Sequence, residues 1–380
     1  MNFDWTIEDK ELKKKLTGLF DPAALAEVDL LEEADLPELR TATLRLLDRL
    51  AETGYTTLAV GPAARGQTLT LTGAQEELAK TSGSLYLAVE SSVRLFGGLI
   101  AGWGGPALAR EILEPIQAGR RIGALALTEP GGDAPGEDWL TKADKAGDDY
   151  VLSGRKNFVT NGPIADWVAV AGAVAGRPAF FILKPGDPGL KPGPRLKTLG
   201  YRGLAVGALE LRQVKVPAER VIGPFQDSEA LIYPRMVQDL ILCALSLGVI
   251  DRVHNAANVH ARTHHRGAKP IYNHQEVRFK LADSFTLRQT AQLLIYRAAW
   301  CFAVEDKEAA ALIHTAKVFS AEAAEKIAAL GLQILAGQGY ITGNVVERGY
   351  REAKYAGLAG TTSEVSRMNI ADDLLRRNPI

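Results

Sequence analysis

Two ionisable side chains four residues apart, Tyr86 and Glu90, could form an acid/base pair. They lie in the string SGSLYLAVESSVRLFGG, which we expect to be helical, and residues at i and i+4 share one face of a helix. Burial would raise the pKa of the Glu90 carboxyl toward a value useful for proton transfer. The alternative, which is the more common use of such a spacing, is a helix salt bridge between Glu90 and Arg94.

A second set of residues combines hydroxyl groups with an aromatic ring. Thr128 lies in LTEPGGD (127–133), and Thr160 lies in GDDYVLSGRKNFVTNG (147–162), two residues after Phe158. Hydroxyl donors on turns, beside an aromatic wall that excludes water, suit the reduced ring of a flavin. The alternative is that the two threonines only cap turns next to Gly and Pro.

The elements that must position these residues fall into three blocks. Residues 1–118 show apolar side chains at helical spacing, and Pro37 stands near an expected helix start. Residues 119–225 contain short β-branched or alternating runs separated by Gly and Pro, which predict strands joined by turns. Helical periodicity returns over 226–380. The order predicts an α+β protein with an N-terminal helical domain, a central β-barrel or sandwich domain and a C-terminal four-helix bundle.

Composition limits the class of protein further. Hydrophobic residues make up 47% of the 380 residues and charged residues 23%, which are globular proportions, and a net charge of -1 argues for neither nucleic acid nor an anionic membrane as partner. The only two cysteines, Cys243 and Cys301, lie in apolar helical patterns, so we expect buried thiols in a reducing, cytoplasmic location. Adjacent histidines at 264 and 265 point apart on a helix, and no metal site is expected.

Several strings together resemble the acyl-CoA dehydrogenase family over nearly the whole chain. The two threonine-bearing strings match in content and spacing, and LGYRG (199–203) followed by VKVPAERVIG (214–223) matches the end of the family's β domain. The resemblance implies FAD as cofactor and an acyl-CoA as substrate. It also implies that Thr128 and Thr160 hydrogen-bond the flavin, with Phe158 against the ring in a position often filled by tryptophan.

The C-terminal string QILAGQGYITGNVVERGYREAKYAGLAGTTSEVSR (333–367) carries the remaining expected cofactor contacts. The resemblance implies that FAD is met across a dimer interface, so the assembly would be a homodimer or homotetramer. The arginine that relatives use for the pyrophosphate is replaced by His264, and Arg266 or Arg262 could take over that charge; the alternative is an exposed basic helix end. The residues assigned to the cofactor in this way are Gln333, Gly337, Gly339, Thr362, Glu364 and Arg266.

The resemblance breaks at the proton acceptor. Gly360 stands where the family usually places its catalytic glutamate, and glycine has no group that could accept a proton. The alternative address used by some relatives corresponds to Gln238, whose amide is not a base near neutral pH. Next to it, Asp239 replaces an arginine that contacts CoA in relatives. Both usual positions for the base are therefore empty.

Three functions remain open. In the first, Glu90, assisted by Tyr86, serves as a non-standard base for an alicyclic or unsaturated acyl-CoA, as in the similar cyclohexene-carboxyl-CoA dehydrogenases, with an electron-transfer flavoprotein as the family's usual acceptor. In the second, the chain is a flavin monooxygenase on the same fold, which needs no such base. In the third, it is a flavin-binding protein without turnover. We expect the first.

Overall fold

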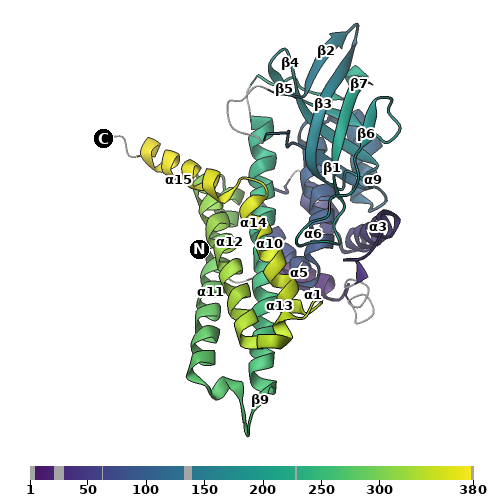
Figure 1. Cartoon of the computed structure of the whole chain (residues 1–380). Coiled ribbons are helices and arrows are strands. Elements are labelled where there is room, and N and C mark those ends of the chain that lie inside the picture. The colour runs from purple at the N-terminus through teal and green to yellow at the C-terminus, as the bar shows by residue number, and fades with distance from the viewer. Residues whose placement is uncertain (1–4, 21–29, 62, 132–138, 227–228, 378–380) are drawn as a thin grey trace.

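The computed structural model describes residues 5–20, 30–61, 63–131, 139–226 and 229–377. Helices come first, a sheet follows, and long helices complete the chain (Figure 1), which confirms the predicted α+β class. The N-terminal helices are α1 (Ile7–Thr17), α3 (Leu36–Thr53), α4 (Tyr55–Val60), α5 (Thr68–Thr81), α6 (Gly83–Glu90), the π-helix η1 (Ser91–Gly97), α7 (Gly98–Trp103), α8 (Gly105–Leu108), the π-helix η2 (Ala109–Leu113) and α9 (Glu114–Gln117).

Local sequence explains where α3 begins and ends. Asp35 accepts a hydrogen bond from the Glu38 backbone and Glu38 returns one to the Asp35 backbone, a capping box with Pro37 in the first turn. Gly54 ends the helix at a φ of 83°, a left-handed conformation that favours glycine. The helix start expected near Pro37 is thus confirmed.

The central strands form a single sheet in the order β6-β7-β3-β2-β4-β5-β8, with β1 added parallel to β4. The long antiparallel pair β3 and β7 forms its spine, and register shifts interrupt that pair between Lys156 and Val159. The strands are β1 (Gly123–Ala126), β2 (Lys142–Ala146), β3 (Asp149–Thr160), β4 (Trp167–Val174), β5 (Arg177–Leu183), β6 (Leu190–Pro192), β7 (Val206–Val216) and β8 (Val221–Ile222), with the 3₁₀ turn η3 (Ala218–Arg220) before β8.

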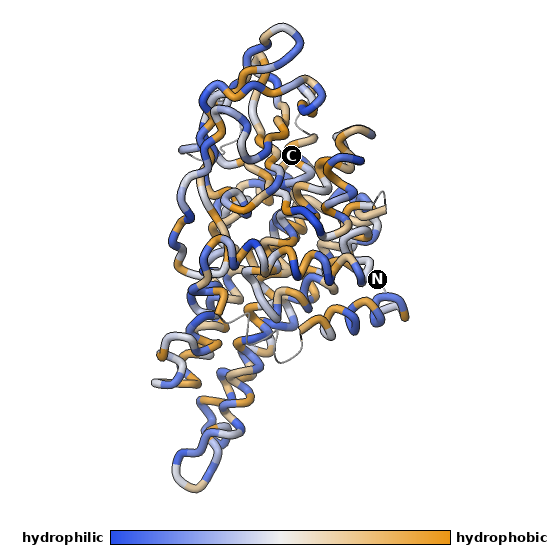
Figure 2. Tube along the Cα trace, turned by 90° about the vertical axis from the view of Figure 1, so that its right-hand side faces the viewer, coloured by the Kyte–Doolittle hydropathy of each residue, from blue (hydrophilic) through white to orange (hydrophobic). Residues whose placement is uncertain are grey.

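The long helix α10 (Glu229–Thr263) packs against α11, α12 and α13 of the C-terminal block and against α5 of the N-terminal block, whereas α15 packs against α12. Apolar and polar residues alternate around these helices, as the orange and blue segments of Figure 2 show, because one face of each is buried. The elements are α10 (Glu229–Thr263), the hairpin β9 (His265–Arg266) and β10 (Lys269–Pro270), η4 (Ile271–Asn273), α11 (Gln275–Ala303), α12 (Ala309–Leu335), η5 (Ala336–Tyr340), α13 (Val345–Ala353), α14 (Tyr355–Leu358) and α15 (Ser363–Arg377).

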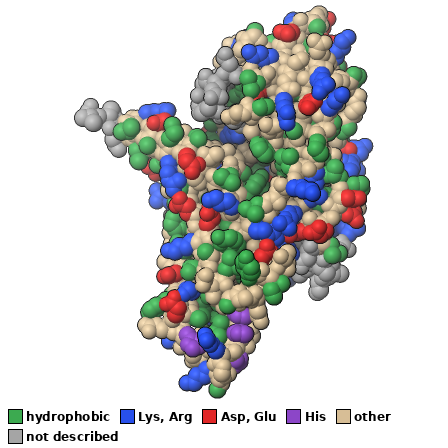
Figure 3. Space-filling model, in the orientation of Figure 1, with side chains coloured by type: hydrophobic (Ala, Val, Ile, Leu, Met, Phe, Trp, Pro, Cys, Tyr) green, Lys and Arg blue, Asp and Glu red, His purple; other side chains and the backbone are tan. Residues whose placement is uncertain are grey.

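On the face drawn in Figure 3, the described residues form no large area of one charge. Lys, Arg, Asp and Glu side chains are interspersed over the face drawn in Figure 3, and histidines gather near the β9–β10 hairpin. One stretch, Gly83–Trp103, is long and apolar enough to cross a membrane by length and composition, but its most apolar window is 83% buried inside the protein, as expected for a core helix.

Candidate active site

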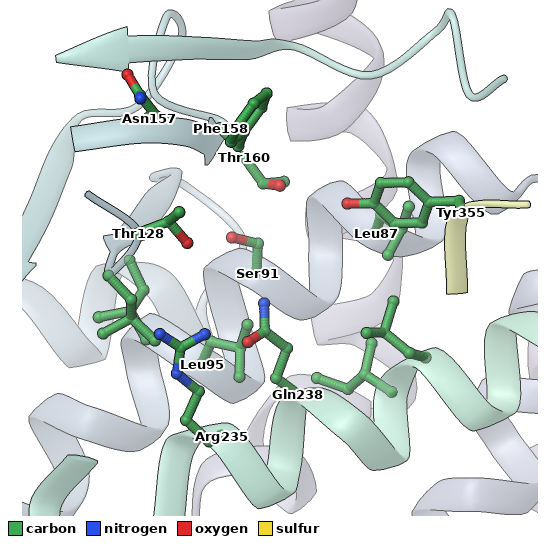
Figure 4. Close-up of a pocket in the computed structure, with 14 residues that line it drawn as sticks. Leu87, Ser91, Leu95, Thr128, Asn157, Phe158, Thr160, Arg235, Gln238 and Tyr355 are labelled. Carbon is green, nitrogen blue, oxygen red and sulfur yellow. The ribbon is translucent and has the colours of Figure 1, made fainter. Parts of the chain in front are cut away.

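A cleft of about 590 Å³, counting the space open to solvent, lies between the sheet, the α6–η1 helix and α10. Figure 4 shows the side chains of Thr128, Thr160, Ser91 and Gln238 converging on it from different elements. The lining residues are Leu87, Ser91, Leu95, Leu125, Leu127, Thr128, Asn157, Phe158, Thr160, Arg235, Gln238, Ile241, Leu242 and Tyr355.

The three residues expected to hold the flavin ring are brought together here. Thr128 follows β1, while Phe158 and Thr160 end β3, and the Asn157 backbone donates a 2.8 Å hydrogen bond to the Thr128 carbonyl that ties the two loops. Phe158 has a φ of 53° and a side chain 67% exposed. A bulky residue in the left-handed region is uncommon and points to a functional constraint. An exposed ring on a strained strand end is ready to pack against a planar ligand.

A buried ion pair anchors these loops from behind. Lys156, with a fully buried side chain, donates from Nζ to the Leu127 carbonyl and to Glu129, each at 2.8 Å. Glu129 also accepts from the backbone amides of Leu140 and Thr141, both at 2.8 Å. The loop backbone before Thr128 is therefore fixed independently of any ligand. Gly132 and Asp133, at the end of LTEPGGD, lie outside the described residues.

The structure does not join Tyr86 and Glu90 in a hydrogen bond. Both are buried, but the Glu90 carboxylate accepts from the Tyr55 hydroxyl and the Gln75 amide, each at 2.5 Å, and the Tyr86 hydroxyl donates to the Ile241 carbonyl at 2.9 Å. Burial raises the pKa of Glu90, and the charge of Arg94 offsets part of that shift without a direct salt bridge. Neither residue lines the cleft, so their catalytic role stays a prediction.

The charged side chains of Asp239 and Lys317 pack against the turn that carries Gly360. Gly360 has a φ of 62°, and a Cβ atom there would stand 2.6 Å from Asp239 Oδ1 and 2.8 Å from Leu242 Cδ1. Asp239 accepts from the Thr361 backbone at 3.0 Å and lies 3.6 Å from Lys317 Nζ. Lys317 in turn donates to the Ala359 and Thr361 carbonyls. The position expected to hold a glutamate in relatives is closed to any larger side chain.

Gln238, Ser91 and Tyr355 are cleft residues to which the sequence analysis assigned no role at the site. The amide oxygen of Gln238 is buried without a hydrogen-bond partner among the described residues. Ser91 follows the i, i+4 stripe of Leu87 and Leu95, a signal that could have identified it. Tyr355 begins the four-residue helix α14, which is too short to show a periodic pattern.

The other residues assigned to the cofactor lie elsewhere. Gln333 and Gly337 are exposed at the end of α12 and in η5, Gly339 packs within η5, and Arg266 is exposed on the β9–β10 hairpin. None of them lines the cleft within this single chain. The resemblance implies that such residues meet FAD across a dimer interface, so their role as cofactor contacts stays a prediction.

The last two assigned residues flank the start of α15. The Thr362 hydroxyl accepts a 3.4 Å hydrogen bond from the Val365 backbone, and Glu364 is exposed in the first turn. Thr362 therefore acts as a helix cap in this chain. The described residues include no cluster of three or more His, Cys, Asp or Glu side chains suited to a metal ion.

Comparison with known proteins identifies the class. Residues 124–214 match the middle domain of acyl-CoA dehydrogenases, and residues 237–375 match the C-terminal domain. The chain is similar to cyclohexane-1-carbonyl-CoA dehydrogenase of Geobacter metallireducens, with 30% identity covering 87% of this chain and 89% of the relative. It is also similar to cyclohex-1-ene-1-carbonyl-CoA dehydrogenase of Syntrophus aciditrophicus, at 30% identity over 72% of this chain and 67% of the relative.

Among solved structures, butyryl-CoA dehydrogenase of Megasphaera elsdenii superposes with a TM-score of 0.89 and 26% identity, covering 99% of this chain and 100% of that one. The chain belongs to the acyl-CoA dehydrogenase family. It is an FAD-dependent oxidoreductase of the acyl-CoA dehydrogenase type, which confirms the family, the cofactor and the enzyme class predicted from the sequence.

Proposed function

We propose that this protein transfers a hydride between FAD and the acyl group of an alicyclic or unsaturated acyl-CoA thioester. The observation that carries the proposal is the cleft, in which two threonine loops and Phe158 face a wall of Leu87, Leu95 and Leu242. An apolar wall opposite a few fixed polar groups suits a ring carried as a thioester. The names of the two alicyclic relatives support the same substrate class.

The residues of the cleft fit the cofactor. Bound FAD supplies a hydride acceptor at N5 when oxidised and a hydride donor when reduced. Thr128 and Thr160 present hydroxyl groups from anchored loops, Phe158 provides an exposed aromatic face, and the leucines exclude water. The buried Gln238 oxygen adds an unfilled acceptor for a ligand donor.

Desaturation of a ring by 1,4-elimination also requires an acceptor for a proton distant from the thioester, and Glu90 is the carboxylate we propose for that proton. Its support is a fully buried side chain whose pKa is raised by burial, one residue before the cleft residue Ser91. To act, its carboxylate must exchange the Tyr55 and Gln75 hydrogen bonds for a position facing the cleft. Tyr86 would assist from the preceding turn of the helix.

The test is anaerobic mixing of the oxidised holoenzyme with cyclohex-1-ene-1-carbonyl-CoA, with flavin bleaching as the readout. Wild type is expected to bleach and Glu90→Gln to lose at least about a hundredfold in rate. Glu76→Gln is a matched control, because Glu76 is a buried carboxylate that likewise accepts from a tyrosine and a glutamine, Tyr296 and Gln292. Bleaching unchanged in Glu90→Gln excludes Glu90 as the base.

A flavin monooxygenase is the second candidate, because none of the described residues that line the cleft is a carboxylate. Such an enzyme consumes dioxygen rapidly once reduced, whereas a closed dehydrogenase site reacts slowly with it. Failure of every thioester to bleach the flavin, together with fast oxygen consumption by the reduced protein, would favour this candidate.

We also propose a cytoplasmic homodimer or homotetramer that passes electrons to an electron-transfer flavoprotein. The turn that carries Gly337 is exposed, and Tyr340 and Ile341 beside it are 86% and 64% exposed, which suits a surface covered by a second subunit. Light scattering on the purified holoenzyme checks the assembly, and a monomeric mass would contradict it.

A further inference from the structure

The cleft contains few groups that can exchange a proton. Of its described lining residues, Arg235 carries a guanidinium group, and Ser91, Thr128 and Thr160 are aliphatic alcohols. Tyr355 is the one lining side chain with a phenol, whose proton can be donated and returned during a reaction. The proton chemistry available inside the cleft therefore centres on Tyr355.

The position of Tyr355 is fixed by its neighbours. Its ring packs edge-on against Tyr201, with centroids 5.3 Å apart, and its hydroxyl points into the cleft toward Thr160. Figure 4 shows that hydroxyl directed toward Thr160 from the opposite side of the cleft. Since Thr160 is the residue assigned to the flavin, the phenol lies beside the place where hydride transfer is expected.

The protonation state of the Tyr355 phenol decides whether it can donate or accept a proton. Burial raises the pKa of Tyr355, and the nearby Thr160 hydroxyl offsets only part of that shift. A phenol that keeps its proton near neutral pH is a proton donor, not a base. Removal of a substrate proton by Tyr355 would thus be disfavoured, whereas delivery of one to a carbanion would be favoured.

We propose, on the basis of the function above, that this protein works as a reductase of a conjugated acyl-CoA, with Tyr355 as the catalytic acid. The Tyr355 hydroxyl gives a proton to the α carbon of the C=C bond next to the thioester, and reduced FAD, when bound, would supply the hydride that the β carbon needs. The π bond is lost, two C–H bonds form, and FAD is left oxidised. Tyr355 then regains its proton from solvent, and an external electron donor reduces FAD again.

The experiment mixes anaerobically reduced holoenzyme with cyclohex-1-ene-1-carbonyl-CoA and follows flavin reoxidation. Wild type is expected to reoxidise, and in deuterated water the product carries deuterium at the α carbon. Tyr355→Phe is expected to slow reoxidation by about a hundredfold or more. Tyr201→Phe, which removes a neighbouring buried hydroxyl outside the cleft, is the matched control and should stay within about twofold of wild type.

A second readout separates chemistry from structure. Calorimetric titration of Tyr355→Phe apoprotein with FAD, and of the oxidised holoenzyme with cyclohexane-1-carbonyl-CoA, should give wild-type affinities. A loss of either affinity in parallel with the rate would make Tyr355 a structural residue and overturn the proposal. So would a wild-type reoxidation rate in Tyr355→Phe, or bleaching by the saturated thioester that is faster than reoxidation by the unsaturated one. If wild type reacts in neither direction, the proposed function itself fails.

Discussion

The loops that carry Thr128 and Thr160 line the cleft, whereas the turn that carries Gly360 lies behind it, next to the lining residue Leu242. The loops are anchored behind by Lys156 and Glu129 and leave hydroxyls and the Phe158 ring facing the open space. The turn instead directs its polar groups at each other, with Lys317 and Asp239 satisfying the backbone around Gly360. The threonine loops therefore leave polar and aromatic groups exposed to a ligand, whereas the space around Gly360 is filled by the charged side chains of Lys317 and Asp239.

This difference shows that position 360 has no free space in which the side chain of a base could stand. At Gly360, where the sequence predicts that a catalytic glutamate is absent, an ion pair occupies the space that a side chain would need. Substitutions at three positions test the contrast.

The largest expected effect comes from Lys317→Met. The change leaves Asp239 buried without its cation and the Ala359 and Thr361 carbonyls without their donor, so we expect a loss of about 3–5 kcal/mol in the free energy of unfolding. Chemical denaturation measures it. Lys354→Met removes an exposed ion pair with Glu325 and should cost less than about 1 kcal/mol. Equal losses of unfolding free energy in Lys317→Met and Lys354→Met would show that Lys317 does not hold the Gly360 turn.

A smaller loss is expected from Gly360→Ala. The left-handed backbone and the 2.6 Å approach of the new Cβ to Asp239 Oδ1 should together cost about 2–3 kcal/mol. Gly343→Ala is the control, because Gly343 has a φ of 90° but nothing within 4 Å of its Cβ position, so it isolates the backbone strain. Gly360→Glu should likewise destabilise the protein without creating a working base. Bleaching by a straight-chain acyl-CoA in Gly360→Glu alone would contradict the steric argument.

The smallest expected effect is the loss of stability in Glu129→Gln, and this loss should depend on pH. Burial alone would raise the pKa of Glu129, but hydrogen bonds from Lys156, Thr141 and Leu140 outweigh it and hold the pKa below its usual range. A carboxyl with a lowered folded-state pKa stabilises the protein above its unfolded pKa, about 4.3, and loses that contribution as the pH falls through the folded value. Glu129→Gln should therefore cost about 1.5 kcal/mol at pH 7.

Denaturation midpoints of wild type and Glu129→Gln, measured from pH 7 down to about pH 3, follow this contribution. The two curves are expected to approach each other below about pH 4.3. A difference that stays constant or grows on acidification would mean that the carboxylate is not held in its charged form by the loop.

Part of the site could be predicted because its chemistry is local. Thr128, Phe158 and Thr160 stand in strings whose Gly, Pro and β-branched residues define strand ends and turns, and the structure brings all three to one cleft. Glu90 could not be placed in the same way. Helical spacing shows that Tyr86 and Glu90 share a face, but only packing decides that Leu87 and Ser91, about 100° further round, are the residues that meet the cleft.

The sequence by itself determined the order of helices and strands, the α+β class and the family, because these depend on periodicity, turn chemistry and short strings. Only the tertiary structure decided that Asp239 fills the space beside Gly360, that Tyr55 and Gln75 take the hydrogen bonds of Glu90, and that Tyr355 enters the cleft. These contacts join residues far apart in the chain. Such pairings are selected by the complete packing of the core, which no local pattern specifies.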